Sequence, residues 1–193
     1  MIQRNLHNSL VTYNGTRLCA VFLYLFFQMT RPGGYEGRKR GTMKTYKGIR
    51  IIGVDTGYGN IKTANSIIPT GITPYDREPT FTGRILKVDG KWYGIGTGHK
   101  AYRSNKNVDD DFYLLTLAAM AEELNAFDLT KADVHLAIGL PLTWFRIQKE
   151  EHYQYMMRKK DLSYQYNDKQ YEIHLVGCSV FPQGYAAIVP LID

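Results

Sequence analysis

The stretch GVDTGYGNIKTAN, residues 53–65, brings an apolar run to a carboxylate, turns through two glycines and places a lysine seven residues after the aspartate. The β-branched run IRIIGVD that leads into it is typical of a strand, and NIKTA can return antiparallel to that strand. Consecutive backbone N–H groups in such a turn can bind an anion, because glycines permit positive φ values and a close approach. The stretch therefore predicts a tight hairpin whose turn can hold a small anion.

Three features of this hairpin suit a phosphate group. Gly57 and Gly59 supply the turn, Lys62 supplies a mobile positive charge, and Asp55 can hold Mg²⁺ through water. The same residues also fit a structural hairpin with an incidental lysine, and the residues alone leave both interpretations open. A Walker loop is excluded because no glycine directly precedes Lys62, and a Rossmann turn is excluded because GxGxxG is absent. We interpret the other glycine-rich stretch, GIGTGHK at 94–100, as a loop that leaves a hairpin.

Composition and charge indicate one folded unit without a basic nucleic-acid surface. The chain has 193 residues, 44% of them hydrophobic, and a net charge of +6. Residues 1–42 carry six Lys or Arg and one Glu, whereas residues 43–193 carry 18 basic and 17 acidic side chains. The excess charge thus lies in the first segment, and we expect no direct binding of nucleic acid. We interpret the basic run Arg158–Lys160 as a solvated helix end.

Cysteine, histidine and aspartate spacing gives no support for a metalloenzyme. Cys19 and Cys178 have neither CxxC spacing nor companions for a disulfide framework, which fits a reducing cytoplasm. The five histidines show no HExxH or similar ligand pattern. The triplet at 109–111, DDD, can be a metal site, but acidic residues also favour a helix N-terminus, and we prefer that use.

The first 42 residues do not resemble the rest of the chain. Their apolar run LCAVFLYLFF, residues 18–27, is ten residues long, whereas a transmembrane helix needs roughly 20. An arginine precedes this run as in a signal peptide, but no A-x-A cleavage site follows it. We interpret residues 1–42 as an N-terminal extension, either upstream of a true start at Met43 or disordered, and we expect no membrane association. Residues 43–193 then form the domain.

The periodicity of residues 43–193 predicts an α/β fold, with a mixed sheet, hairpins and flanking helices. Two hairpins are marked by turn residues, and a proline should end one buried strand. The predicted elements are a hairpin at 84–96 around Asp89-Gly90, a helix at 109–127, a buried strand at 133–142 that stops at Pro141, a helix at 149–162 and a hairpin at 164–181 around Asn167-Asp168.

The residues carry a resemblance to a known superfamily. DTGYGNIK, residues 55–62, resembles the first phosphate motif D-x-G-x-x-x-x-K of the actin, Hsp70 and sugar-kinase superfamily. Two later stretches, LAIGLPLTWF at 136–145 and the segment from Met156 to Ile188, resemble the corner and the connecting segment of the bacterial actin-like ATPases of the plasmid-segregating ParM/StbA kind. The resemblance covers Met43 to the end and implies a ribonuclease H-like, actin-like N-terminal lobe.

This resemblance implies a role for particular residues. Asp55 would contact Mg²⁺ through a water molecule, Lys62 would reach the phosphates of ATP, and Gln183 would orient the attacking water. The turn between Asp55 and Lys62 would hold the β- and γ-phosphates through Thr56, Gly57, Tyr58, Gly59 and Asn60. On spacing alone, a polar residue at a helix start after Pro182 is the better interpretation of Gln183.

The resemblance also implies a cytoplasmic, filament-forming ATPase that uses ATP and Mg²⁺ and serves plasmid or mobile-element DNA segregation. Its partners would be further copies of itself and a DNA-binding adaptor protein. The family's second phosphate loop would lie beyond Asp193, so we expect a lobe that is incomplete at its C-terminus and does not hydrolyse ATP alone. Two other interpretations remain open: a non-catalytic interaction module, and a lobe of another member of the superfamily, such as a kinase or chaperone.

Overall fold

A single mixed β-sheet and two helices form the domain in the computed structural model, which describes residues 43–80, 83–98 and 110–183. The expectations for residues 1–42, for Asp109 and for the segment after Gln183 lie outside these residues. The strands are β1 (Lys44–Tyr46), β2 (Ile49–Thr56), β3 (Asn60–Lys62), β4 (Ile67–Pro69), β5 (Ile72–Tyr75), β6 (Arg84–Val88), β7 (Lys91–Ile95), β8 (Lys131–Leu140), β9 (Asp161–Tyr166) and β10 (Lys169–Pro182), and the helices are α3 (Asp111–Asn125) and α4 (Leu142–Met157).

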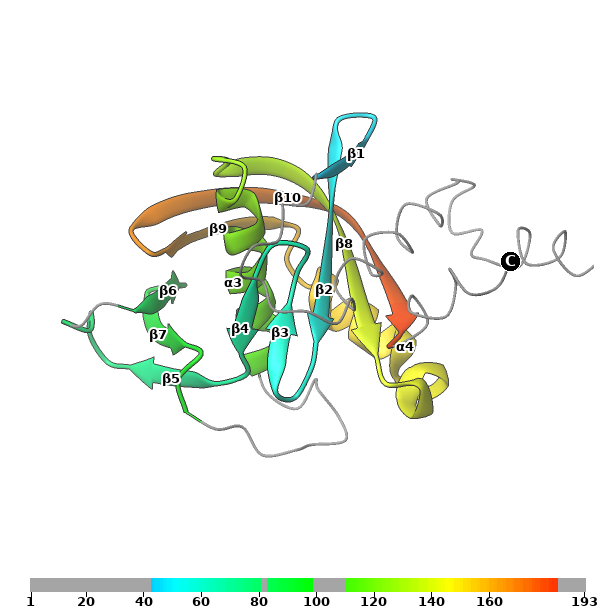
Figure 1. Ribbon diagram of the computed structural model, residues 1–193, viewed down its shortest axis with the longest axis horizontal. Helices are drawn as coiled ribbons and strands as arrows, with labels where there is room; N and C mark the ends of the chain where they lie inside the picture. Colours follow the sequence, from blue (N-terminus) through cyan, green and yellow to red (C-terminus); the bar gives the residue numbers. More distant parts are fainter. Residues whose placement is uncertain (1–42, 81–82, 99–109, 184–193) are drawn as a thin grey trace, which may run out of the picture.

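The strand order is β4-β3-β2-β8-β10-β9-β6-β7-β5, with β1 paired to the start of β2 (Figure 1). In the centre of the sheet, β2, β8 and β10 run parallel, and all the other pairings are antiparallel. Parallel neighbours are buried on both faces, which explains the nearly continuous apolar runs of β2 and β8. The predicted fold class, a mixed sheet with hairpins and flanking helices, is confirmed.

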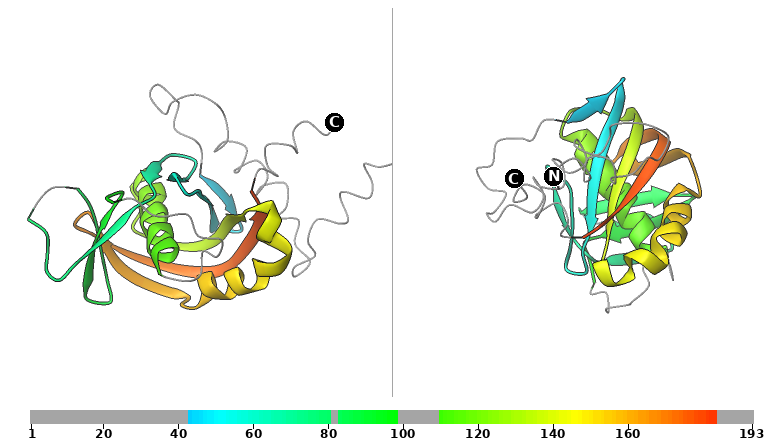
Figure 2. Two further views of the ribbon diagram at one scale, coloured as in Figure 1. Left: turned by 90° about the horizontal axis from the view of Figure 1, so that it is seen from below. Right: turned by 90° about the vertical axis from the view of Figure 1, so that its right-hand side faces the viewer.

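The sheet curls around α3. Its two ends, β4 and β5, follow each other in the chain with only Thr70 and Gly71 between them, so the strands come back close to their starting point (Figures 1 and 2). Because α3 lies inside this curve, twelve of its 15 residues are buried. A helix that is enclosed on most sides needs apolar residues on most sides, and this explains its weak amphipathic pattern. The helix predicted at 109–127 is confirmed between Asp111 and Asn125.

Two hairpin turns fix the register of four strands. Asp89 and Gly90 have φ values of 48° and 77°, and Asn167 and Asp168 have φ values of 46° and 63°. Positive φ at both central residues belongs to the type I′ turn, whose twist suits a two-residue hairpin. Asn167 also joins the two hairpins, since its amide N–H donates to the carbonyl of Ile85 at 3.0 Å and its Oδ1 accepts from the Ile85 amide at 2.9 Å. Both predicted hairpins are therefore confirmed.

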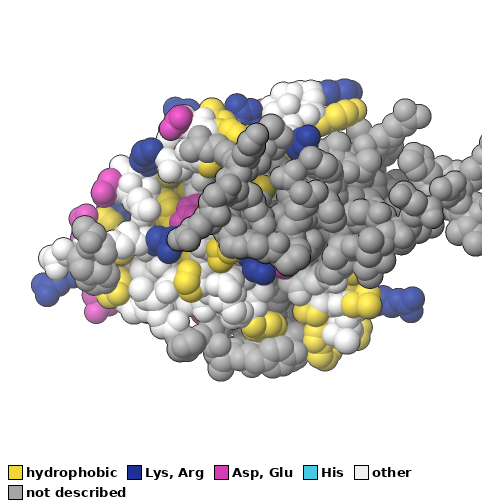
Figure 3. All heavy atoms as spheres, viewed as in Figure 1, with side chains coloured by type: hydrophobic (Ala, Val, Ile, Leu, Met, Phe, Trp, Pro, Cys, Tyr) yellow, Lys and Arg dark blue, Asp and Glu magenta, His cyan; other side chains and the backbone are white. Residues whose placement is uncertain are grey.

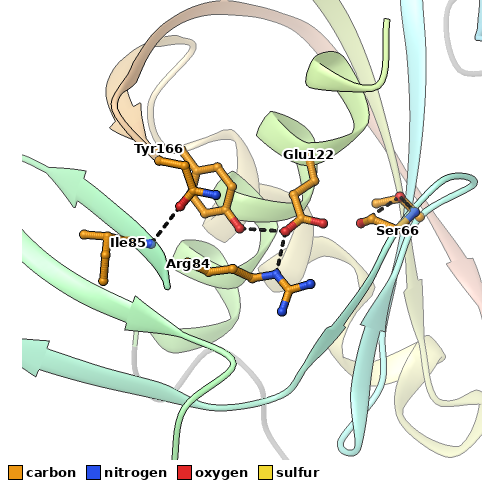
Figure 4. Close-up of polar contacts among 7 residues, drawn as sticks. Ser66, Arg84, Ile85, Glu122 and Tyr166 are labelled. Carbon is orange, nitrogen blue, oxygen red and sulfur yellow. Dashed lines mark hydrogen bonds and ion pairs between the residues drawn. The ribbon is translucent and has the colours of Figure 1, made fainter. Parts of the chain in front are cut away.

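Glu122 ties the outer hairpins to α3. Arg84 Nε and the hydroxyl of Tyr166 both lie 2.7 Å from Glu122 Oε1, and Figure 4 shows the two side chains converging on this carboxylate. Burial is the largest cause of the raised pKa of Tyr166, and the Glu122 carboxylate raises it further. The phenol therefore stays protonated as a donor, and one charged group anchors β6 and β9 to the central helix.

The predicted start of the second helix is wrong. We expected a helix at 149–162, but α4 begins at Leu142, directly after Pro141, and ends at Met157, so that Asp161 and Leu162 belong to β9. The carbonyl of Pro141 accepts from the amides of Trp144 and Phe145, each at 3.0 Å. Proline suits this N-cap position because it has no N–H to leave unpaired, and its backbone, with φ −52° and ψ 137°, ends the strand without yet being helical. Pro141 thus ends β8, as predicted, and also opens α4.

The longest strand, β10, changes partners along its length. Its first part pairs with β9, and its second part, after a bulge between Leu175 and Gly177, packs against α4 (Figure 2). Gly177 suits the bulge, because a Cβ there would lie 3.1 Å from the ring of His135 on β8, and the ring would have to shift by a few tenths of an ångström. The carboxyl end of β10 thus stays beside β8, which places Gln183 at the edge described below.

His135 makes the fold sensitive to acid. Its Nε2 lies 3.0 Å from Ser179 Oγ, and burial lowers its pKa from 6.5 to about 4. Between pH 4 and pH 6.5 the unfolded chain binds a proton at His135 that the folded chain does not. The free energy of unfolding therefore keeps its full His135 contribution above about pH 6.5 and loses it as the pH falls towards 4. Between pH 7.5 and pH 5, we expect the free energy of unfolding of His135→Gln to fall by about 2 kcal/mol less than that of the wild type, as measured by urea unfolding. Parallel losses in the two proteins would contradict this prediction.

Candidate functional site

Three parallel strands end at one edge of the sheet. β2 ends at Thr56, β8 at Leu140 and β10 at Pro182, and the turn between β2 and β3 lies at this same lower edge in Figure 1. In open α/β sheets, ligands bind outside the carboxyl ends of parallel strands. The predicted phosphate turn and the predicted catalytic glutamine are therefore on the same side of the molecule.

Thr56 fastens this turn to the neighbouring strand. Its side chain is fully buried, and its Oγ1 donates to the carbonyl of Gly139 on β8 at 3.3 Å. β2 and β3 pair through Asp55 opposite Lys62 and Thr56 opposite Ile61, so the turn itself comprises Gly57, Tyr58 and Gly59. The Thr56 side chain thus anchors the start of the turn to β8, and only the Thr56 backbone can face a ligand.

The two glycines of the turn act differently from our expectation. Neither Gly57 nor Gly59 has a positive φ, so the expectation of left-handed backbone is wrong. Gly57 is needed for space instead, because a Cβ there would lie 2.6 Å from the carbonyl oxygen of Asn60. Gly59 has open space around its Cβ position and is exposed. The narrow turn comes from close backbone approach at Gly57.

Tyr58 points its ring into the protein. The ring packs edge-to-face on Phe112 of α3, with centroids 5.8 Å apart, and joins the main core. A turn residue anchored in this way holds the backbone in place, and its own side chain is not directed at a ligand. Any contact of Tyr58 with a phosphate would therefore come from its backbone N–H. Asn60, in contrast, is exposed at the start of β3.

Gln183 and Asp55 meet although 128 residues separate them. Gln183 Nε2 lies 3.0 Å from Asp55 Oδ1 and 3.4 Å from the carbonyl oxygen of Thr56, and its backbone N–H donates to the carbonyl of Leu140 at 2.6 Å. The carboxylate and the carbonyl only accept, so the amide nitrogen must face them. The amide oxygen Oε1 then remains to accept a hydrogen bond from another group, such as a water.

Lys62 lies opposite Asp55 on the returning strand and is partly exposed. Within the described ranges it forms no ion pair at 4 Å or less. Its flexible stem can carry the ammonium group towards an anion at the turn. The structure thus brings Asp55, the turn, Lys62 and Gln183 to one edge, while the side chains of Thr56 and Tyr58 point inward.

Thr70, which lies between β4 and β5, was not predicted to take part in the site. Its Oγ1 donates to the carbonyl of Gly57 at 2.7 Å, and its backbone N–H donates to the carbonyl of Gly59 at 3.0 Å. A threonine in the short PTG corner has no pattern that points to this role, because its partners lie 11 and 13 residues earlier. Strand pairing between β3 and β4 alone brings them together.

The donors at this edge suit Mg²⁺ held through water. Among the described residues there is no group of three or more His, Cys, Asp or Glu that could hold a metal ion. A single carboxylate, Asp55, cannot form a complete cage, but Mg²⁺ usually keeps several waters and binds through one or two carboxylates and substrate phosphates. The residues therefore fit an ion that arrives with phosphate groups and touches Asp55 through its water shell.

Asp110 of the acidic triplet and two members of the basic run at 158–160 form ion pairs with other side chains. Asp110 precedes α3 and binds Arg158 Nη1 at 2.5 Å, and Arg158 stacks over the Tyr113 ring at 3.8 Å. Lys159 binds Asp89 at 3.0 Å. The basic run at 158–160 thus follows a helix end, as predicted, but two of its members are paired. Figure 3 shows Lys and Arg side chains scattered on the viewed face, with acidic groups among them.

Comparison with known proteins identifies a family and similar folds. Residues 53–185 match the family described as "Actin like proteins N terminal domain". The structure is similar to apo psk41 ParM, with a TM-score of 0.57, 13% identity and coverage of 71% of this chain and 50% of that chain. It is similar to a 15-stranded ParM filament from Clostridium botulinum, with a TM-score of 0.56, 22% identity and coverage of 72% and 48%.

A third similar structure is the archaeal actin homologue Ta0583 in complex with ADP, with a TM-score of 0.54, 18% identity and coverage of 74% of this chain and 46% of that chain. At these identities the similarity establishes the fold. No curated protein sequence matches the chain. The chain spans about half the length of the solved structures that it matches. In the described part of the chain, no helix is long and apolar enough to cross a membrane.

Proposed function

The chain belongs to the actin-like proteins through their N-terminal domain, and from this premise we propose that it is the phosphate-binding lobe of a nucleotide-dependent, filament-forming protein. The observation that carries the proposal is the hydrogen bond of 3.0 Å between Gln183 and Asp55, at the edge where the β2–β3 turn lies. Two stretches with no local relation meet beside the turn to which the proposal assigns the phosphate. The parallel course of β2, β8 and β10 brings the two stretches together, and a phosphate held by the turn would then lie beside the Gln183 amide.

Each residue has a specific task in this proposal. The exposed backbone of the turn binds the terminal phosphates, and Lys62 adds positive charge beside them. Asp55 accepts from Gln183 with one oxygen and holds the water shell of Mg²⁺ with its carboxylate. Mg²⁺, when bound with ATP, neutralises charge on the phosphates. Gln183, fixed by Asp55 and by the Leu140 carbonyl, offers Oε1 to the attacking water, since phosphoryl transfer depends mainly on positioning and electrostatics.

One lobe encloses only one side of a nucleotide. We therefore propose weak binding of Mg-ATP by this chain and hydrolysis only when a second lobe completes the site. Self-association is the proposed partner interaction, because similar structures are filaments. Leu142 and Ile147 on α4 are 72% and 75% exposed, and such apolar side chains can lie between subunits. A DNA-segregation role in the cytoplasm, with a DNA-binding adaptor, completes the proposal.

The test is a titration of the 193-residue chain with Mg-ATP, followed by ¹⁵N NMR. We expect a Kd weaker than about 0.1 mM, with the largest shifts at the backbone amides of Tyr58 and Asn60. Lys62→Ala should weaken binding about tenfold, because a charge beside the phosphates is lost. Lys91→Ala, at an exposed position on β7, is the matched control and should bind like the wild type. Equal affinity of the Lys62→Ala variant and the wild type would refute the phosphate site.

A further inference from the structure

We infer that Thr70 is a positioning residue that orients the backbone of the phosphate-binding turn. Thr70 is 5% exposed and donates two hydrogen bonds, one from its side chain and one from its backbone, to carbonyls of that turn. The inference rests on the proposed function, because it assigns a means of orienting the turn that would bind the phosphates.

The two hydrogen bonds fix two peptide planes. A trans peptide is planar, so its C=O and the N–H of the following residue point in opposite directions. Because the Gly57 carbonyl points at Thr70 Oγ1, the Tyr58 N–H is directed away from Thr70. Because the Gly59 carbonyl points at the Thr70 N–H, the Asn60 N–H is likewise directed away from Thr70. Thr70 thereby sets the direction of two amide groups that can donate to an anion.

Thr70 can do this because the corner that carries it is itself fixed. The next residue, Gly71, lies so close to the loop after β7 that a Cβ there would be 2.3 Å from the Gly98 oxygen and 2.5 Å from the Thr97 oxygen. The Gly71 carbonyl also accepts from the Gly96 amide at 2.9 Å. Backbone contacts with the glycine-rich loop GIGTG at 94–98 therefore hold the corner in place.

The role requires a hydroxyl donor on the side chain of residue 70. Serine keeps the donor, while valine keeps the shape of threonine without the donor. Thr70→Val leaves the backbone bond to Gly59 in place but removes the bond to Gly57, so the first peptide plane can rotate. Thr97→Val is a matched control, since the Thr97 hydroxyl bonds Thr73 and the Gly94 carbonyl and does not touch the turn.

The test is the Mg-ATP titration of the 193-residue chain by ¹⁵N NMR, with urea unfolding of the same variants. We expect Thr70→Val to weaken binding about fivefold to tenfold, and Thr70→Ser and Thr97→Val to stay within about twofold of the wild type. Affinity is measured where each variant is fully folded, so a purely structural role would lower stability without changing Kd. If Thr70→Val does not fold, Thr70→Ala, which also lacks the donor, replaces it with the same expectation.

The outcomes separate this inference from the proposed function. A wild type that binds Mg-ATP, with Thr70→Val binding equally well, overturns the role of Thr70 and leaves the phosphate site standing. A wild type that shows no binding at millimolar Mg-ATP overturns the proposed function, and the positioning role with it. Weakening by both Thr70→Val and Thr70→Ser overturns the assignment to the hydroxyl, because serine retains that donor.

Discussion

Gly57→Ala is expected to abolish detectable Mg-ATP binding and to lower the free energy of unfolding by about 2 kcal/mol, while Gly59→Ala changes the stability little. The two glycines lie two residues apart in the same turn, and neither has a positive φ. Their responses should nevertheless differ, because the space around them differs.

The reason is the close approach of two backbone segments. A Cβ on Gly57 would lie 2.6 Å from the carbonyl oxygen of Asn60, whereas a Cβ on Gly59 would have no heavy atom within 4 Å. The obstacle at Gly57 is backbone, so the turn itself must open to accept a methyl group. Opening the turn moves the carbonyls that Thr70 holds and the amides that would face a phosphate.

Urea unfolding measures the stability of both variants, and an NMR titration with Mg-ATP measures their binding. Gly59→Ala is the matched control, because it adds the same methyl group to a glycine of the same turn. A Gly57→Ala variant with wild-type stability and affinity would show that the turn adapts freely to a methyl group. The proposal that phosphate binding depends on the shape of this turn would then be wrong.

Local signals in the sequence were sufficient for the hairpins. Asp89-Gly90 and Asn167-Asp168 both adopt positive φ at two successive positions, as their residue types favour. The β2–β3 hairpin was also predicted, although for a partly wrong reason, because Gly57 provides space rather than left-handed backbone. Such features are determined by residues within a few positions of one another, and they can be predicted from the sequence for that reason.

Features that depend on distant packing were not predicted. The first two turns of α4 lie outside the predicted helix because Pro141 was interpreted only as the end of β8. The short strands β4 and β5 were missed, and so was the closure of the sheet around α3. β5 depends on β7 and β6 on β9, which lie farther along the chain, whereas β4 pairs with the neighbouring strand β3 and was missed although its partner is close.

The site shows the same division. Asp55, Lys62 and Gln183 were selected from two separate stretches, but no spacing in the sequence says that Gln183 Nε2 lies 3.0 Å from Asp55. That contact exists because β2, β8 and β10 run parallel and end together. The role of each residue in binding or catalysis stays a prediction, which turnover measurements can test.

Gln183→Ala and Lys62→Ala should fail in different ways once a second lobe completes the site. In a two-lobed version, made by joining this domain to the C-terminal half of an actin-like relative, Lys62→Ala should raise the Kd for Mg-ATP about tenfold. Gln183→Ala should leave the Kd within about threefold but slow the turnover of bound ATP about a hundredfold. The first change removes charge from the bound phosphates, and the second removes the partner of the attacking water.

Gln170→Ala is the matched control for the second variant. Gln170 is on the same strand as Pro182, the residue before Gln183, but it is exposed at the far end and bonds Ser163 Oγ at 3.0 Å, so its loss should change neither constant. Single-turnover hydrolysis and nucleotide titration of the same protein separate the two effects, and the unsubstituted fusion sets the reference. If Gln183→Ala weakened binding as much as Lys62→Ala while bound ATP turned over normally, Gln183 would only join β10 to Asp55. The attacking water would then need a partner from another element, because the Gln183 amide would serve the fold alone.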